Sequence, residues 1–106
     1  MEEPAGESIG VITYNPARFD LVTMHLIVAC FETGTLSSAA KKFNLVPGAA
    51  SRRIRKLEQA LGCQLFNRNA KGMLPTLAGK TLLPHALALV QRMDCLVDEL
   101  TEMRNH

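Results

Sequence analysis

The spacing of hydrophobic residues predicts a helix near the start of the chain. From residue 21 onward, apolar residues recur at steps of three and four, which places them on one face of a helix. They are Leu21, Met24, Ile27, Val28 and Phe31. Asp20 offers a side-chain oxygen to the first free amides, and Gly34 is suited to end the helix in a left-handed conformation. We therefore expect a helix from residue 21 to about residue 33.

A second, short helix follows directly. Ser37 can cap it, and it would run through Ala39, Ala40 and Phe43 to a turn at Asn44. Small side chains at its centre let another helix cross closely. Two helices that meet in this way at a steep angle form a helix-turn-helix unit.

The third predicted helix has a hydrophobic face and a cationic face. Pro47 suits its first turn, where the missing amide costs nothing, and Gly62 is a stop signal. At about 100° per residue, one face holds Ala50, Ile54, Leu57 and Leu61. The opposite face holds Gly48, Arg52, Arg55 and Lys56, with Ser51 and Arg53 on its flanks. We expect the first face in the core, while the second carries positive charge.

After Gly62 the hydrophobic period changes and predicts a small hairpin, or wing. Residues 63–67 could form a short strand, and residues 69–72 would turn the chain back. Arg68 and Lys71 would then lie at the tip of the wing, beside the cations of the third helix.

A long helix is predicted for the rest of the chain. Thr76 can cap it, and Pro84 inside it predicts a bend. Apolar residues alternate steps of three and four there, as in the a/d seam of a coiled coil. This predicted dimer interface consists of Leu83, Ala86, Val90, Met93, Val97 and Leu100, and it is widened by Leu89, Leu96 and Met103. The alternative is an amphipathic helix folded back onto its own domain.

Together the elements predict a mainly α fold, a winged helix-turn-helix of three helices and a β-hairpin followed by a long dimerisation helix. Residues 1–18 contain Pro and Gly and no hydrophobic period, so we expect a flexible leader. Residues 19–75 would form the winged helix-turn-helix, and residues 76–106 the linker and dimerisation helix. The composition agrees, because 47% of the residues are hydrophobic but only 5% are aromatic, which suits packed helices.

The net charge of +2 hides three unequal parts. Residues 1–40 carry a net charge of −4, residues 41–71 one of +7, and residues 72–106 one of −1. A basic block between two acidic ones indicates a localised site for a polyanion. A solvated helix face is the alternative explanation of the same charges.

Other classes of protein find little support in the sequence. Three widely spaced cysteines and no signal-peptide core favour a reduced, cytoplasmic protein, with Cys30 and Cys63 in the core and Cys95 partly exposed. No run approaches the roughly 18 apolar residues of a membrane span. Because no close Cys/His set, phosphate loop or catalytic motif is found, we expect no metal, no cofactor and no enzyme activity.

Four segments in order resemble one family. Residues 19–40 look like the LysR-type opening, where a first helix ends in Gly and leads to an Ala-Ala pair. Residues 49–58 resemble the recognition helix of that family, residues 61–68 its entry to the wing, and residues 75–79 its entry to the linker helix. The resemblance covers residues 19 to about 103. The chain departs from the family at residues 46–48, where Val-Pro-Gly stands in place of the usual Ser-Gln-Pro.

The resemblance implies the DNA-binding domain of a bacterial LysR-type transcriptional regulator. Its recognition helix would enter the major groove, its wing would reach the backbone or the minor groove, and two copies would pair through the long helix on an inverted-repeat operator. The effector domain of the intact regulator would be absent from this chain. The residues expected at DNA are Ser37, Lys41, Lys42, Pro47, Gly48, Ser51, Arg52, Arg53, Arg55, Lys56, Arg68, Lys71 and Thr76.

A function from another class stays open at this point. A winged-helix module could dimerise through its long helix and use the basic face to bind an acidic protein, without reading DNA sequence. Both functions predict salt-sensitive binding. Preference among DNA sequences of equal length separates them.

Overall fold

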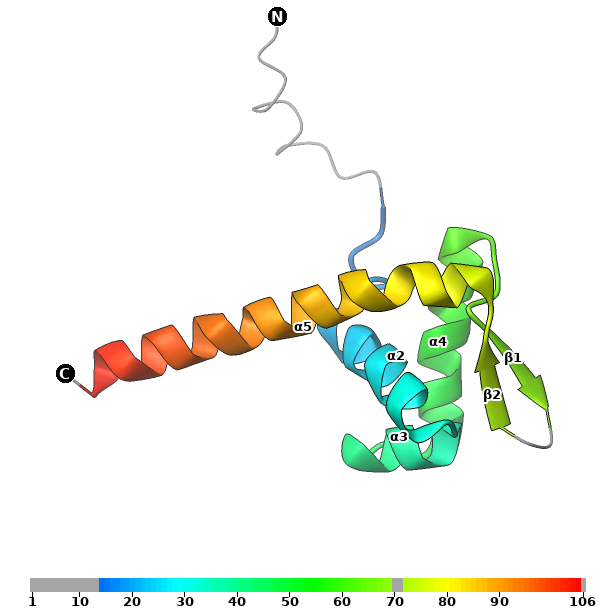
Figure 1. The fold of residues 1–106 in the computed structure, drawn as a ribbon, viewed down its shortest axis with the longest axis horizontal. Coiled ribbons are helices and arrows are strands. Elements are labelled where there is room, and N and C mark those ends of the chain that lie inside the picture. Colours follow the sequence, from blue (N-terminus) through cyan, green and yellow to red (C-terminus); the bar gives the residue numbers. More distant parts are fainter. Residues whose placement is uncertain (1–13, 70–71, 106) are drawn as a thin grey trace, which may run out of the picture.

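The computed structural model of the protein describes residues 14–69 and 72–105. Its elements are α2 (Leu21–Thr33), α3 (Leu36–Lys42), α4 (Pro47–Leu61), β1 (Phe66–Asn69), β2 (Gly72–Pro75) and α5 (Leu77–Arg104). The two strands pair antiparallel. In Figure 1, α2, α3, α4 and the hairpin gather at one end, and α5 extends away from them to the C-terminus. The predicted winged helix-turn-helix with a long last helix is confirmed.

Helix α2 is the centre of the core and contacts α3, α4 and α5. Its buried residues lie around most of its circumference, and Leu26 and Ile27 are fully buried. Asp20 caps it as predicted, because Oδ1 accepts a hydrogen bond from the Thr23 amide at 2.9 Å. Gly34 ends it with a φ of +79°. A helix that is apolar on several sides is stable only when other elements cover it.

The predicted cap of α3 is wrong by two residues. Thr35 is the N-cap, and its Oγ1 accepts from the Ser38 amide at 3.2 Å. Ser37 is exposed inside the first turn. Thr35 directly follows the left-handed Gly34 and has the extended backbone that a cap requires, so the helix begins before Ser37.

The crossing of α2, α3 and α4 depends on small side chains, as predicted. Ala40 of α3 and Ala50 of α4 are fully buried in one cluster with Leu26 of α2. Ala39 is fully buried as well. Because these side chains end at Cβ, the three helix backbones can approach closely.

Helix α4 begins at Pro47 and ends before Gly62, as predicted. Val46 stands at its N-cap and makes no side-chain hydrogen bond, while Gly62 has a φ of +76°. Ile54 is fully buried on the core face, as are Ala50 and Leu57. Leu61 was also expected there, but it is 40% exposed. It lies in the last turn, where it borders an open apolar hollow instead of the core.

The strand predicted over residues 63–67 begins three residues and ends two residues too early, because β1 spans Phe66–Asn69. Leu65 and Phe66 are buried, whereas Cys63, expected in the core, is exposed. The chain uses the residues after Gly62 to turn away from α4 before the strand can start. Arg68 pairs with Met73 inside the hairpin and is not at its tip. Lys71 lies outside the described residues.

Two glycines allow the hairpin to approach the helices. A Cβ on Gly72, whose φ is +123°, would lie 2.6 Å from the Gly34 carbonyl oxygen at the end of α2. A Cβ on Gly79, in the first turn of α5, would overlap the Leu65 carbonyl oxygen, which accepts from the Thr76 amide at 2.9 Å. The wing is therefore tied to both helices through backbone groups.

Helix α5 continues through Pro84 as one element. Two residues of the predicted dimer seam are not available to a partner, because Ala86 is fully buried and Val90 is only 8% exposed in the core cluster. They lie opposite α2, which covers the first half of α5. Leu83 is half-buried. The alternative, a helix folded onto its own domain, is thus correct for the first half.

The second half of α5 extends beyond the domain. Met93 is 38%, Val97 53% and Leu100 56% exposed. Leu89, Leu96 and Met103 are exposed on the same side. The described residues of the chain do not cover this apolar stripe.

The expected leader falls largely outside the described residues. Its last residues, 14–18, form a turn, and the ring of Tyr14 lies edge-on against Phe19 with centroids 5.1 Å apart. Of the cysteines, Cys30 is buried and Cys95 exposed, as predicted. Burial raises the pKa of Cys30 to about 11 against the opposing charge of Arg68, so its thiol stays protonated.

Candidate nucleic-acid interface

Helix α4 presents one cationic face to solvent. Arg52, Arg55 and Lys56 are exposed on the side opposite its core residues, as is Gly48. Arg52 reaches back over the first turn of α4. Its Nη1 lies 3.8 Å from the position that a Cβ on Gly48 would occupy. A Cβ at that distance would make only an ordinary van der Waals contact with the guanidinium. The face predicted from the helical period is therefore assembled as expected.

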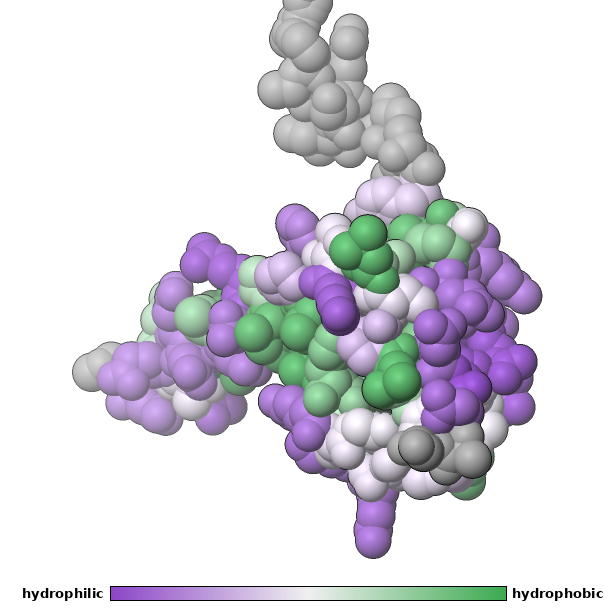
Figure 2. Space-filling model, turned by 45° about the vertical axis from the view of Figure 1, so that its right-hand side comes forward, coloured by the Kyte–Doolittle hydropathy of each residue, from purple (hydrophilic) through white to green (hydrophobic). Residues whose placement is uncertain are grey.

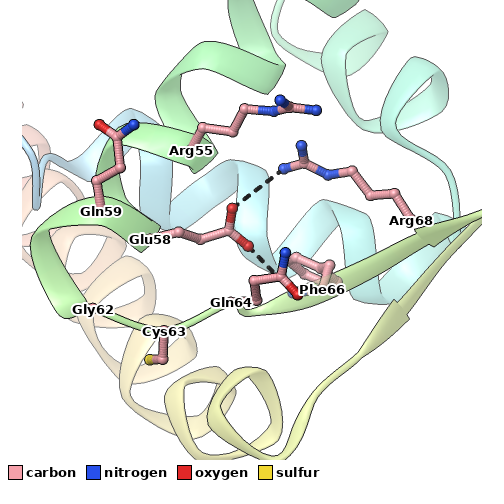
Figure 3. Close-up of a pocket in the computed structure, with 8 residues that line it drawn as sticks. All are labelled: Arg55, Glu58, Gln59, Gly62, Cys63, Gln64, Phe66 and Arg68. Atoms are coloured by element: carbon pink, nitrogen blue, oxygen red, sulfur yellow. Dashed lines mark hydrogen bonds and ion pairs between the residues drawn. The ribbon is translucent and has the colours of Figure 1, made fainter.

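On one flank of α4, the wing encloses a hollow of 570 Å³. Arg55 of α4 and Arg68 of β1 both point toward it, and their guanidinium groups lie near each other (Figure 3). Glu58 lies between the helix and the strand, with its carboxylate directed at Arg68 and the start of β1. The hollow thus joins the cationic face to the wing.

Arg68 is bound within the fold. Its Nη2 is 3.7 Å from Glu58 Oε1, and its Nη1 donates to Ser51 Oγ at 3.4 Å. The two charged side chains are only 24% and 12% exposed. Within the described part of the chain, Nε and Nη2 of Arg68 have no hydrogen-bond acceptor. Arg68 and Ser51, both predicted DNA residues, therefore meet at the base of the wing.

Glu58 is a structural residue that the sequence analysis did not identify. Its Oε2 accepts from the amides of Leu65 at 2.8 Å and Phe66 at 3.4 Å. One carboxylate thus joins α4 to the first residues of the wing. The available signal was its charge, because Glu58 is the only acid in the basic block of residues 41–71.

On the opposite flank, Arg53 is directed to the start of α2. Its Nη1 donates to Asp20 Oδ2 at 2.7 Å, with both side chains about one-third exposed, at 38% and 33%. Burial alone would raise the pKa of Asp20, but hydrogen bonds from Thr23 and the charge of Arg53 outweigh it and lower that pKa. Arg53 is therefore held by Asp20, a partner that helical spacing did not predict, whereas Arg52 is exposed.

Further predicted residues lie around the turn between α3 and α4. Ser37, Lys41 and Pro47 border one hollow. Lys42 forms an ion pair with Glu32 at 3.3 Å, but both side chains are more than half exposed. Such a pair contributes little, so Lys42 can exchange this partner for another anion.

Thr76 caps α5, as predicted. Its Oγ1 accepts from the Gly79 amide at 3.1 Å and donates to the Gln64 carbonyl at 2.6 Å. The hydroxyl hydrogen is therefore used inside the fold. The backbone amides in the first turn of α5 that have no partner inside the helix could still donate to an anion.

The distribution of polarity matches this arrangement. On the side drawn in Figure 2, hydrophilic side chains cover the region beside the wing, and apolar side chains gather where the long helix meets the globular part. Across residues 14–69 and 72–105, no three His, Cys, Asp or Glu side chains are grouped so that they could hold a metal ion. None of the helices in these residues has the length and hydropathy required to cross a membrane.

Comparison with known proteins identifies the family. The sequence model of the "Bacterial regulatory helix-turn-helix protein, lysR family" matches residues 21–80. Among curated proteins, the chain is 35% identical over 86 residues to "Uncharacterized HTH-type transcriptional regulator YbhD" of Escherichia coli (strain K12), covering 81% of the chain and 27% of YbhD. It is 31% identical over 81 residues to "HTH-type transcriptional activator TtdR" of the same strain, covering 76% of the chain and 26% of TtdR.

A solved structure agrees with these matches. The structure named "Crystal Structure of BenM_DBD/catB site 1 DNA Complex" has a TM-score of 0.75 and 26% identity to this chain, over 82% of this chain and 98% of the chain in that structure. The chain spans about a quarter of the length of YbhD and TtdR. The matched quarter contains the helix-turn-helix. The chain therefore belongs to the LysR family of bacterial regulatory helix-turn-helix proteins, and it contains the DNA-binding domain of a transcriptional regulator.

Proposed function

We propose that this chain reads a specific sequence in double-stranded DNA with α4 in the major groove. The observation that carries the proposal is the exposed face of Gly48, Arg52 and Arg55, which lies on a helix whose other side is fixed in the core. A major groove about 12 Å wide admits one α-helix. The DNA bound to the similar BenM domain supports the same class of partner.

Within this face, Arg52 is the proposed base reader. A bidentate arginine to guanine O6 and N7 is the commonest specific contact in the major groove. Pro47 and Gly48 offer no base-reading side chain, which leaves Arg52 in the central position, assisted by Arg55 and Ser51. The wing then lies on the sugar-phosphate backbone or in the adjacent minor groove. Lys41 and Lys42, in the last turn of α3, bind phosphates.

The second half of α5 would pair with a second copy of the chain. Its exposed stripe continues into a groove of 410 Å³ between α5 and the start of α2, lined by Phe19, Leu21, Leu89, Met93 and Leu96 among others. Burial of these side chains on a second copy favours association. Two domains related by twofold symmetry would then read an inverted repeat, in the cytoplasm where bacterial DNA is found.

Selection from a random pool of DNA duplexes tests the proposal. The chain should enrich one sequence, or an inverted repeat of it, over all others of equal length. Arg52→Ala should abolish most of this enrichment, whereas Arg104→Ala, at the far end of α5, should not.

A winged-helix module that binds an acidic protein is the other candidate function. The basic face would also make its binding salt-dependent, so salt dependence does not separate the two functions. If the pool yields duplexes with no shared sequence, while binding still weakens with salt, specific DNA reading is excluded.

A further inference from the structure

The turn before α2 brings an additional cation to the side of α4. Arg18 belongs to residues 15–18, where the Ala17 amide donates to Asn15 Oδ1 at 2.9 Å and the Arg18 amide donates to the Asn15 carbonyl at 2.9 Å. Phe19, next in the chain, packs on the core cluster and against Tyr14. These contacts fix the backbone of a segment that the sequence alone classed with the flexible leader.

Arg18 and α4 together enclose a hollow of 250 Å³. Its charged lining consists of Arg18, Asp20, Arg52, Arg53 and Lys56, which amounts to four cations and one anion. Asp20 accepts hydrogen bonds from Thr23 and from Arg53, so its charge is already matched. The charged lining keeps a net charge of +3, which attracts an anion to the hollow.

The position of this hollow relative to α4 indicates what kind of anion it would bind. Ser51 and Glu58 on one flank of α4 contact the wing, whereas Arg53 on the other flank contacts Asp20, beside Arg18. A helix with its side chains is about 10–12 Å wide and nearly fills a major groove about 12 Å wide. Both of its flanks then face a sugar-phosphate backbone, and the flank away from the wing presents Arg18 and Lys56 to one strand.

We propose that Arg18, Arg53 and Lys56 form a phosphate-binding site for the DNA backbone on the flank of α4 opposite the wing. The proposal rests on the proposed function, since it assumes α4 in the groove. Arg18 and Lys56 contact a phosphate directly, and Asp20 holds Arg53 in place beside it. This site adds a contact from outside the helix-turn-helix and the wing, and it does not read sequence.

Binding of the 106-residue chain to the enriched duplex and to a random duplex, measured over a range of salt concentrations, tests this site. Arg18→Ala should weaken both complexes by the same factor and reduce the slope of log K against log salt by about 0.9, the value for one phosphate contact. Arg18→Lys should keep most of the slope, since the charge remains. Arg104→Ala is the matched control, because it removes the same side chain from the far end of α5.

A duplex with single methylphosphonate substitutions places the contact on the DNA. Replacement of the contacted phosphate by this neutral group should weaken wild-type binding but leave Arg18→Ala unaffected. The thermal unfolding temperature of Arg18→Ala should equal that of the wild type. This result would exclude a loss of folding as the cause of the weaker binding.

Two results would overturn the site while leaving the proposed function intact. Arg18→Ala could behave like Arg104→Ala in both affinity and slope, or it could change the preferred base at one position, which a phosphate contact does not do. If the wild-type chain fails to select any DNA sequence and binds no duplex, the proposed function fails together with the site.

Discussion

Arg52 and Arg53 are neighbours in the sequence, yet their surroundings differ. Arg52 is exposed and reaches back over Gly48, whereas Arg53 is tied to Asp20 at 2.7 Å. Both were predicted DNA-binding residues. Helical spacing placed Arg52 on the cationic face and Arg53 on its flank, but it did not predict the partner of Arg53. The ion pair therefore supports the proposed division, in which Arg52 contacts bases and Arg53 lies at the backbone.

Arg52→Ala should weaken binding to the selected duplex by about 1–3 kcal/mol and weaken random DNA much less, because a base contact is lost. Arg52→Lys should restore only part of the affinity, since an ammonium group cannot reproduce the planar fork. Fluorescence anisotropy on both duplexes measures this. Equal losses on the two duplexes would instead assign Arg52 to a phosphate and transfer base reading to Arg55 or to the shape of the DNA.

The pKa of Asp20 predicts a particular response to acid. Because the fold lowers this pKa below its ordinary 3.8, the carboxylate stabilises the fold above that pH, and the contribution is lost as the pH falls through the folded-state pKa. Asp20→Asn keeps a capping oxygen but removes the charge that faces Arg53. The variant should be less stable than the wild type at neutral pH, and the two should converge below pH 3.8.

Urea denaturation of both proteins across this range measures the difference. Equal stability of the two proteins at neutral pH, or a difference that does not close as the pH falls, would contradict a stabilising role for the charge of Asp20.

Among the elements, the wing depends most on contacts distant in sequence. Two strands of four residues each cannot form a stable hairpin alone. Glu58 accepts from the amides of Leu65 and Phe66, and it pairs with Arg68 of β1 at 3.7 Å. Gly72 and Gly79 let the wing approach α2 and α5. Contacts with three helices therefore hold the wing in place.

Replacement of Glu58 by Gln tests this joint. The amide can still accept from Leu65, but Arg68 loses its carboxylate partner in a site where it is only 24% exposed. We expect a loss of about 1–3 kcal/mol in the free energy of unfolding. Glu58→Ala should lose more and expose the Leu65 and Phe66 amides to hydrogen exchange. Gln59→Ala, an exposed neighbour on the same helix, is the control, and equal stability of the Gln59 and Glu58 variants would contradict the assignment.

At the scale of the whole molecule, α5 performs two tasks. Its first half completes the core through Ala86 and Val90, and its second half extends apolar side chains away from the domain. Figure 1 shows this division, since only part of α5 lies over the other helices. A substitution therefore has a different effect depending on its position along the helix.

Val97→Asp and Val90→Asp separate the two tasks. Val97 is 53% exposed, so a charge there should dissociate the proposed dimer and leave the domain folded. Val90 is 8% exposed in the core, so a charge there should unfold the domain. Gln91→Asp places the same charge on the opposite side of α5 and should change neither property.

Sedimentation at tens of micromolar and circular dichroism measure the two properties. A monomeric wild-type chain at that concentration would contradict dimerisation through α5, because a dimer of micromolar affinity would form there.

The sequence by itself determined the order of the elements, the fold class and the cationic face of α4. Helical periodicity, the Asp20 and Thr76 caps and the stops at Gly34 and Gly62 act over a few residues, so they can be read without the fold. The same local signals predicted Ser37 as the cap of α3, whereas Thr35 caps it, because the backbone after the left-handed Gly34 is extended at Thr35.

Only the tertiary structure decided how the charged and apolar side chains are used. The pairs Arg53–Asp20 and Arg68–Glu58 join residues from different elements, and no spacing along the chain predicts which cation meets which carboxylate. The same is true of α5, whose predicted seam runs from Leu83 to Leu100 in sequence but is divided by the position of α2. Periodicity shows that a face is apolar, but only the packing of the fold shows what covers it.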